Sequence, residues 1–323
     1  MDILGKTRRL LGRAKRKAQN IGLDPLRGVK SQQLLANNLH KANLASHAVA
    51  HCVANKEHQA MLFASLQLGL DVVVDSREIC AKHIKQYLPL IQPADIAGLV
   101  RIGGCEDGGY VMLPPTPPIL DSQPKAISLG VSYHSPWDLE MANVGYQVLQ
   151  YDASIKRASY KHPNIIFHKK FAGIHQDRQT TTLEQILCDY HFDPKAHNIL
   201  QIDIEGAEWD IFERIDFTML ERYFAQIIME FHDCDPRSIA KTQRYTAILS
   251  RFIKSYQPIH LHFNPCGGVV YVKDEFFAPV FEVSYVRRDL LPPNFKLREF
   301  CGDLALLDYP NNDMLPNFPI IFR

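Results

Sequence analysis

The sequence predicts an α/β protein, in which a mostly parallel sheet with helices on both faces follows a helical extension. From about residue 95, apolar runs of strand length alternate with helical patterns, which is typical of parallel sheets. Upstream of that point the chain shows long helical periodicity instead. We therefore predict a basic tail over residues 1–30, a helical extension over residues 31–94 and an α/β domain over residues 95–323.

The composition excludes several classes of protein. The 323 residues include 36 Lys and Arg against 35 Asp and Glu, so the net charge of +1 gives no sign of nucleic-acid binding. The seven cysteines are scattered without a C-x-x-C pair, which favours a reducing compartment over a disulfide framework or a structural zinc site. No apolar run reaches the roughly 18 residues of a membrane span, and the N-terminus lacks a signal core. We expect an intracellular, soluble protein.

The first 23 residues form a strongly basic stretch with a single acid, Asp2. Its apolar residues recur at helical spacing, so we predict a basic amphipathic helix that lies on an anionic membrane surface. This would hold a cytoplasmic protein at the inner face of a membrane. A solvated tail and a mitochondrial presequence are the alternatives.

Residues 31–70 are predicted to be helical, with one apolar stripe that suits a homo-oligomer or another partner. The stripe consists of Leu35, Ala42, Val49, Val53 and Ala60. Four histidines share the opposite face, and we interpret them as solvated polar residues rather than a metal site. They are His40, His47, His51 and His58. A second helix is expected from Arg77 to Ile91, ended by Pro89 and Pro93.

Five apolar runs are predicted as parallel strands: KAISLG, YQVLQYD, NIIFHKK, NILQID and QIIMEF. The helical patterns are SPWDLEMANVG, TTLEQILCDY, AEWDIFERI and SIAKTQRYTAILSRFIKSY. After them come IHLHF, GGVVYV and PVFEVSYV, with no helix between them. The sheet should therefore end in an antiparallel hairpin.

Ligands bind beyond the carboxyl ends of strands in an open parallel sheet, so the residues at those ends are candidates. The first strand ends at Gly130, where a nucleotide can approach the backbone, and the second ends at Asp152, which can accept hydrogen bonds from ribose hydroxyls. A dinucleotide would need G-x-G-x-x-G after the first strand, but residues 130–135 contain one glycine. S-adenosylmethionine, which carries no phosphate, tolerates this turn.

Seven sequence blocks between residues 98 and 290 carry a family resemblance. They are RIGGCEDGGYVML, ISLGVSYHSPWDLEMA, YDAS, LQIDIEGAEWDIF, IIMEFHD, HLHFNPCGG and FEVSYVRRDL. In this order they resemble the FkbM-type family of S-adenosylmethionine-dependent methyltransferases and its animal methyltransferase-like relatives. The resemblance implies a seven-stranded, Rossmann-like methyltransferase sheet with a terminal antiparallel hairpin.

The resemblance also assigns site residues. Ser128, Leu129 and Gly130 resemble the cofactor-binding turn, and Asp152 resembles the acid that binds the ribose. Ser132 stands where the family often has a second glycine, so a positive φ there would strain the loop. The substrate side is expected to include the DGGY block and the H-x-N block, with residues Asp107, Tyr110, Glu230, His262 and Asn264, and also Glu282. The DGGY glycines alternatively form a structural hairpin turn.

Acidic residues and a histidine follow the fourth and fifth strands. Asp203 and Glu205 should face the point of methyl transfer, whereas Glu208 and Asp210 should lie in the first turn of the next helix, where they oppose its dipole. His232 is the candidate general base, with a structural histidine as the alternative.

Several roles near these residues stay open. A second use of the acids is a divalent metal site made of Asp203, Glu205 and Asp233. Trp209 is expected in the core. Arg287 and Arg288 are expected to be surface charges, or to bind an anionic acceptor.

The predicted function is therefore S-adenosylmethionine-dependent O-methylation of a hydroxyl in a sugar or glycan intermediate. An NAD(P)-dependent oxidoreductase would use the same sheet and Asp152. A catalytically silent scaffold acting through its N-terminal helices is the non-enzyme alternative.

Overall fold

The structure, a computed structural model, describes residues 25–105, 107–115, 123–302, 304–311, 314–315 and 317–322. The first 24 residues, and with them most of the predicted basic tail, lie outside this range. Within the described residues, no helix has the length and apolarity to cross a bilayer.

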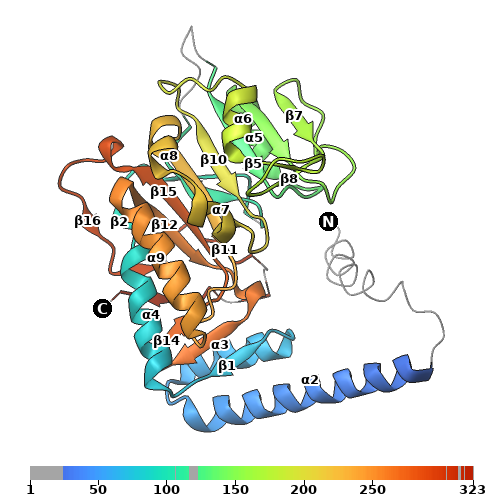
Figure 1. Cartoon of the computed structure of the whole chain (residues 1–323). Coiled ribbons are helices and arrows are strands. Elements are labelled where there is room, and N and C mark those ends of the chain that lie inside the picture. The colour runs from blue at the N-terminus through green and yellow to red at the C-terminus, as the bar shows by residue number, and fades with distance from the viewer. Residues whose placement is uncertain are drawn as a thin grey trace.

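The centre of the molecule is a seven-stranded mixed sheet in the order β12-β15-β11-β10-β5-β6-β7 (Figure 1). The strands β5, β6, β7, β10 and β11 are mutually parallel, and β15 runs antiparallel to both β11 and β12. The bounds are β5 Lys125–Leu129, β6 Gln147–Tyr151, β7 Ile165–His168, β10 Ile199–Ile202, β11 Gln226–Phe231, β12 Tyr256–Phe263 and β15 Phe281–Arg287. The predicted strand runs thus form the sheet of a mixed α/β protein.

The GGVVYV run is a strand but not part of this sheet. It forms β13, Val269–Val272, which pairs in parallel with β1, Val72–Val74, and antiparallel with β14, Glu275–Phe277. The neighbours β12 and β15 are therefore joined through η1, Pro265–Gly267, and a small second sheet rather than by a short turn. An apolar run identifies a strand but not its partner, because β-branched residues suit any buried ladder.

Helices cover the two faces of the sheet. One face packs against α4, α6, α7 and α9 in one large apolar cluster, with α8 beside them, and the other packs against α5 and the β3–β4 hairpin. The bounds are α4 Glu78–Ile91, α5 Pro136–Val144, α6 Leu183–Asp189, α7 Glu208–Arg214, α8 Phe217–Tyr223, α9 Ile239–Ser255, β3 Val100–Ile102 and β4 Tyr110–Met112. Pro89 lies inside α4 instead of ending it, because a proline this close to Ile91 removes few helical hydrogen bonds.

Short strand pairs and a 3-10 turn complete the fold. They are β2 Ala94–Asp95 with β16 Lys296–Leu297, β8 Phe171–Ala172 with β9 Thr180–Thr181, β17 Phe300–Cys301 with β18 Ile320–Ile321, and η2 Arg288–Leu290. Two of these pairs tie the C-terminal residues back onto the edge of the main sheet beside β12.

The helical extension consists of two helices instead of one. α2, Pro25–Cys52, ends before Asn55, whose side-chain oxygen accepts hydrogen bonds from the first amides of α3, Lys56–Gln67. This N-cap overrides the continuous periodicity, because a capping side chain stabilises a new helix start. Of the predicted stripe, Val49 and Val53 are buried.

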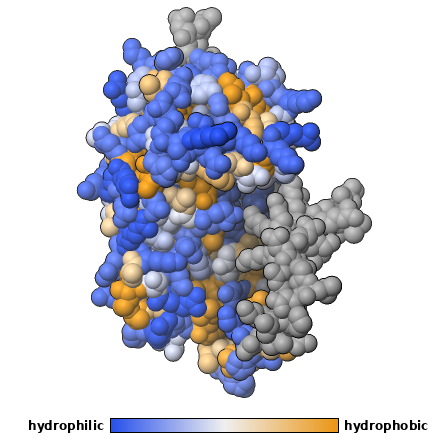
Figure 2. Space-filling view, turned by 45° about the vertical axis from the view of Figure 1, so that its right-hand side comes forward, coloured by the Kyte–Doolittle hydropathy of each residue, from blue (hydrophilic) through white to orange (hydrophobic). Residues whose placement is uncertain are grey.

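Most of α2 extends away from the rest of the protein (Figure 1). Ala42 and the large side chains of Leu34, Leu39 and Leu44 are exposed there. In the view of Figure 2, hydrophobic surface residues form small, separate patches among hydrophilic ones. The exposed leucines of α2 are therefore the large apolar groups that lack burial in the extension.

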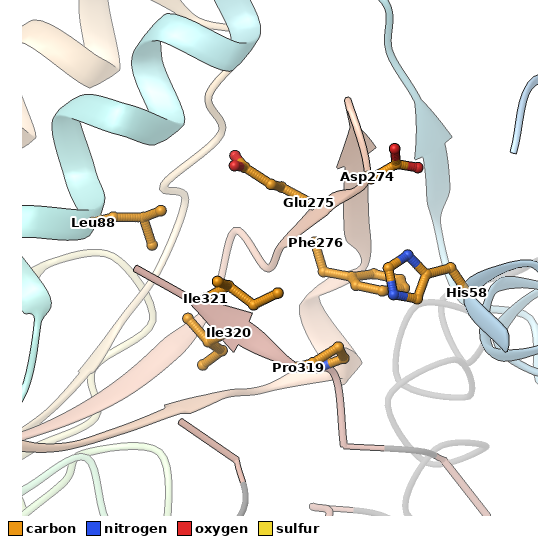
Figure 3. Close-up of a pocket in the computed structure, with 8 residues that line it drawn as sticks. All are labelled: His58, Leu88, Asp274, Glu275, Phe276, Pro319, Ile320 and Ile321. Atoms are coloured by element: carbon orange, nitrogen blue, oxygen red, sulfur yellow. The ribbon is translucent and has the colours of Figure 1, made fainter. Parts of the chain in front are cut away.

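The break between α2 and α3 separates His58 from the other three histidines. His40, His47 and His51 are exposed, as expected of solvated residues. The ring of His58 instead packs edge-on against Phe276, and its Nδ1 lies 3.0 Å from the Tyr271 hydroxyl (Figure 3). The pocket in Figure 3, between α3, α4, β14 and β18, has a volume of about 10 Å³, enough for about one water. It is a joint between the extension and the core, remote from the strand ends.

Candidate active site

Two strand ends meet where Gly130 follows β5 and Asp203 follows β10. Gly130 has a φ of +87°, and a Cβ added there would lie 1.6 Å from the Asp203 carbonyl oxygen. The Gly130 amide donates to the Tyr151 carbonyl at 3.1 Å, and the Asp203 amide donates to the Leu129 carbonyl at 2.9 Å. Only glycine permits this contact, which holds the first turn, β6 and Asp203 together.

The predicted cofactor residues occupy different environments. Asp152 lies at the end of β6, next to Gly130, and its Oδ1 accepts a hydrogen bond from the Ser154 amide at 2.5 Å. The Ser128 hydroxyl is buried and donates to Gln201 at 2.9 Å, so it stabilises the sheet interior. Only the backbone of Ser128 therefore belongs to the turn.

The predicted strain at Ser132 is wrong. The non-glycine residues with positive φ in the described chain do not include it. Its hydroxyl donates to the His134 carbonyl at 2.7 Å and accepts from the His134 amide at 3.1 Å. A serine turn of this kind needs no left-handed residue, so the loop after β5 is compatible with serine.

His232, which follows β11, is fixed by a buried carboxylate. Glu208 Oε1 accepts a hydrogen bond from the His232 amide at 2.8 Å and lies 3.2 Å from Nδ1, while Oε2 accepts from the Gly206 amide at 2.8 Å. Because an ionised carboxylate only accepts hydrogen bonds, Nδ1 is the donor and Nε2 is left to accept a proton. Trp209 Nε1 donates to the His232 carbonyl at 2.7 Å, and the Trp209 ring stacks on Tyr245 in the core.

The structure brings His232, Asp203 and Glu205 together as predicted. Nε2 of His232 lies 3.6 Å from Asp203 Oδ1 and 3.9 Å from Glu205 Oε2. Burial alone would lower the pKa of His232, but the hydrogen bond and charge of Glu208, with the charges of Asp203 and Glu205, raise it overall. Burial raises the pKa of Asp203 to about 7, with His232 acting in the opposite direction. This pair can hold one shared proton near neutral pH.

Behind Asp203 lies a buried polar layer. Glu230 is 5% exposed and accepts a hydrogen bond from Asn264 Nδ2 at 2.6 Å. Burial and then the charge of Asp203 raise the pKa of Glu230 well above its ordinary value, so it is protonated at neutral pH. The buried Tyr110 hydroxyl accepts from Gln201 Nε2 at 3.1 Å. Burial, and then the charge of Asp203, raises the pKa of Tyr110 well above 10.

His262 and Glu282 continue this layer and contact the C-terminal segment. Nε2 of His262 lies 3.1 Å from Asn317 Oδ1, and Glu282 Oε1 accepts from Asn311 Nδ2 at 2.7 Å. Burial raises the pKa of Glu282 to about 7 and lowers that of His262. The C-terminal segment therefore borders the site.

The DGGY block is a hairpin turn that also faces the site, so both interpretations of it contribute. The turn joins β3 to β4, and a Cβ at Gly109 would lie 2.2 Å from the Gly104 carbonyl oxygen. The exposed carboxylate of Asp107 in this turn raises the pKa values of Asp203, Glu230 and Glu282. Asp107 is thus electrostatically coupled to the acids at the strand ends.

The metal ligands predicted from the sequence do not form one group. Asp233 pairs with Lys241 at 3.0 Å instead of joining Asp203 and Glu205. Within the described residues, Asp203, Glu230 and His232 offer ligand atoms that all lie within 4.8 Å of one another. A single oxygen or nitrogen from each would suit a divalent cation.

The two arginines and Asp210 serve the surface. Arg287 pairs with Asp289 at 2.6 Å, while Arg288 donates to the Ile253 carbonyl and to Gln257 Oε1. Asp210 pairs with Arg244 at 2.5 Å. These contacts support the surface interpretation of the arginines over the anionic-acceptor one.

Sequence reasoning missed several residues of the site. Glu208 does begin α7, but its side chain turns back to His232 instead of only opposing the helix dipole. The spacing of two residues after Gly206 was the one available signal. Asn311 and Asn317 had none, because contacts from a chain terminus depend on tertiary structure alone.

Comparisons with known proteins identify the family. No curated protein and no solved structure matches the chain significantly. The Methyltransferase FkbM domain matches residues 13–238, which includes Gly130, Asp152, Asp203, Glu208 and His232. The match covers more than half of the sequence, so the chain belongs to the FkbM methyltransferase family.

Proposed function

We propose that the protein is an S-adenosylmethionine-dependent O-methyltransferase that acts on a hydroxyl of a sugar or glycan intermediate. The observation that carries the proposal is the His232–Glu208 pair, which presents Nε2 beside Asp203 at the end of the sheet where Gly130 and Asp152 also lie. Methyltransferase family membership favours methyl transfer over the oxidoreductase alternative.

The residues at the strand ends fit the cofactor. Gly130 leaves the turn after β5 without a side chain, and the neighbouring Asp152 carboxylate suits a ribose diol. When bound, S-adenosylmethionine supplies a methyl group on a positively charged sulfur. Asp203 adds a nearby carboxylate, and a negative charge favours a cation at short range.

His232 acts as general base on the acceptor. Its Nε2 takes the proton of the acceptor hydroxyl as the oxygen forms its bond to the methyl carbon and the carbon–sulfur bond breaks. Glu208 keeps the imidazole oriented and stabilises the imidazolium that forms. Asp203 and Glu205 lie close enough to that imidazolium to stabilise its charge.

Calorimetric titration of the full chain with S-adenosylmethionine tests the cofactor. We expect micromolar binding that Asp152→Ala weakens at least tenfold, because the ribose loses its carboxylate. Asp95→Ala, which removes an exposed acid from β2, serves as the matched control and should bind like the parent. Absence of binding by the parent chain would favour the catalytically silent scaffold.

A further inference from the structure

Three carboxylates occupy neighbouring positions on adjacent strands at the carboxyl end of the sheet. Glu230 and Glu282 are direct partners across β11 and β15. Asp203 follows the pair Ile202–Met229, so it lies level with Glu230 on β10. Side chains at level positions of adjacent strands share one face of a sheet. Asp203, Glu230 and Glu282 therefore form a continuous acidic row.

The row is crowded enough to resist further negative charge. Glu230 and Glu282 are 5% and 6% exposed. Their burial, their mutual repulsion and the charge of Asp107 oppose ionisation. An anionic group placed beside the row would meet the same repulsion.

The C-terminal segment adds an independent sign of a ligand. Asn311 donates its amide nitrogen to Glu282. Its amide oxygen is buried, and within the described part of the chain it has no hydrogen-bond partner. A buried amide oxygen left without a donor is costly. A hydroxyl or ammonium group of a ligand would satisfy it.

The arginine that acts electrostatically on Glu282 is already engaged. Arg101 donates its Nε to the Gly104 carbonyl at 2.5 Å and its Nη1 to the Leu307 carbonyl at 3.0 Å. An Arg that recognises phosphate or carboxylate normally offers its fork to the anion. The oxygens of Asp107, Glu282 and Asn311 thus favour hydrogen-bond donors in the ligand.

We propose that the site selects a hydroxyl-rich acceptor without negative charge and rejects phosphorylated or carboxylated acceptors. The proposal rests on the proposed methyltransferase function and narrows its substrate class. A unit negative charge about 6 Å from one ionised carboxylate, at an effective dielectric constant of about 20, weakens binding on the order of a hundredfold.

The test is methyl transfer into a small-molecule cell extract separated by charge. Anion-exchange resin divides the extract into a retained, anionic pool and an unretained pool, and each is incubated with the full chain and methyl-labelled S-adenosylmethionine. We expect at least tenfold more label in the unretained pool. Equal or greater labelling of the retained pool would overturn the selectivity while leaving the methyltransferase function intact.

Two further outcomes separate the causes. Label in neither pool, with S-adenosylmethionine binding intact by calorimetry, would contradict the proposed function and the selectivity with it. Asp107→Asn removes one exposed charge, so it should shift the ratio toward the retained pool severalfold. The matched control Glu184→Gln, which removes an exposed acid from α6, should leave the ratio unchanged. A ratio unmoved by Asp107→Asn would overturn the electrostatic cause.

Discussion

At the scale of single residues, the site depends on carboxylates whose environments differ. Glu208 is completely buried but accepts three hydrogen bonds, whereas Glu205 is exposed next to the same histidine. A carboxylate surrounded by donors remains ionised, and one surrounded by other acids takes up a proton. The neighbours of each acid therefore decide its chemical role.

Glu208→Gln should lower kcat/KM about ten- to a hundredfold and move its acidic limb to lower pH. Glu208 is a cause of the raised His232 pKa, and a base is active only above that pKa. Activity therefore rises with pH through the titration of the His232–Asp203 pair, and losing the Glu208 charge lowers that pKa. Asp210→Asn, two residues along α7, is the control. An unshifted pH–rate profile in Glu208→Gln would contradict the positioning role.

Glu282→Gln should stabilise the protein at pH 8 by roughly 2 kcal/mol and have little effect at pH 4. Burial raises the pKa of Glu282 to about 7, so the folded state binds this proton more tightly than the unfolded state does. The associated stability is complete below the ordinary pKa of glutamate and is lost as pH rises through 7. Urea unfolding at both pH values measures this, with the exposed Glu299→Gln as control.

At the scale of elements, the contact between β5 and β10 positions the site. Gly130 and Gly206 lie on either side of Asp203 and both have positive φ, +87° and +105°, but only Gly130 lacks room for a Cβ. The sheet order brings these turns together, and it also aligns Glu282 with Glu230.

Gly130→Ala should abolish S-adenosylmethionine binding and destabilise the fold by several kcal/mol, because its Cβ would collide with the Asp203 carbonyl. Gly206→Ala meets no atom within 4 Å, so it should cost only the backbone strain of about 1–2 kcal/mol. Thermal unfolding and calorimetry of both variants make the comparison. Equal effects would show that φ alone, rather than the close contact, requires glycine at residue 130.

The sequence predicted elements and strand ends better than it predicted neighbours. Gly130, Asp152, Asp203 and His232 could be found because each follows an apolar run, and the ends of parallel strands share one edge. The separate sheet of β13 and the Asn311 contact could not be found, since both depend on residues distant in the chain. The short helix α8 was missed because its seven residues give too little periodicity.

At the scale of the whole molecule, both ends of the chain fasten onto the side of the sheet formed by β12 and β15. The extension does so through β1 and His58, and the C-terminal segment through Asp308 and Asn311. His260 Nε2 and Asp308 Oδ1, both nearly fully buried, lie 2.7 Å apart. The site is thus bordered by residues from widely separated parts of the sequence.

We expect α2 to mediate self-association. Leu34, Leu39 and Leu44 are 63%, 63% and 58% exposed on a helix that extends from the body, and an isolated helix gains little stability without packing. Light scattering should give a dimer mass for the full chain and a monomer mass for a chain beginning at residue 46, which keeps the buried Val49 and Val53. The triple substitution of the three leucines by Gln should also give a monomer. A monomeric full chain would contradict this.

The pairing of β1 with β13 also constrains the order of folding. Val72–Val74 hydrogen-bonds with Val269–Tyr271, almost the whole length of the domain later in the chain. During synthesis these three valines leave the ribosome long before their partner exists, so an apolar strand edge waits unpaired. Contacts this far apart in sequence form slowly. We therefore expect nascent chains halted before residue 269 to require chaperone protection of β1.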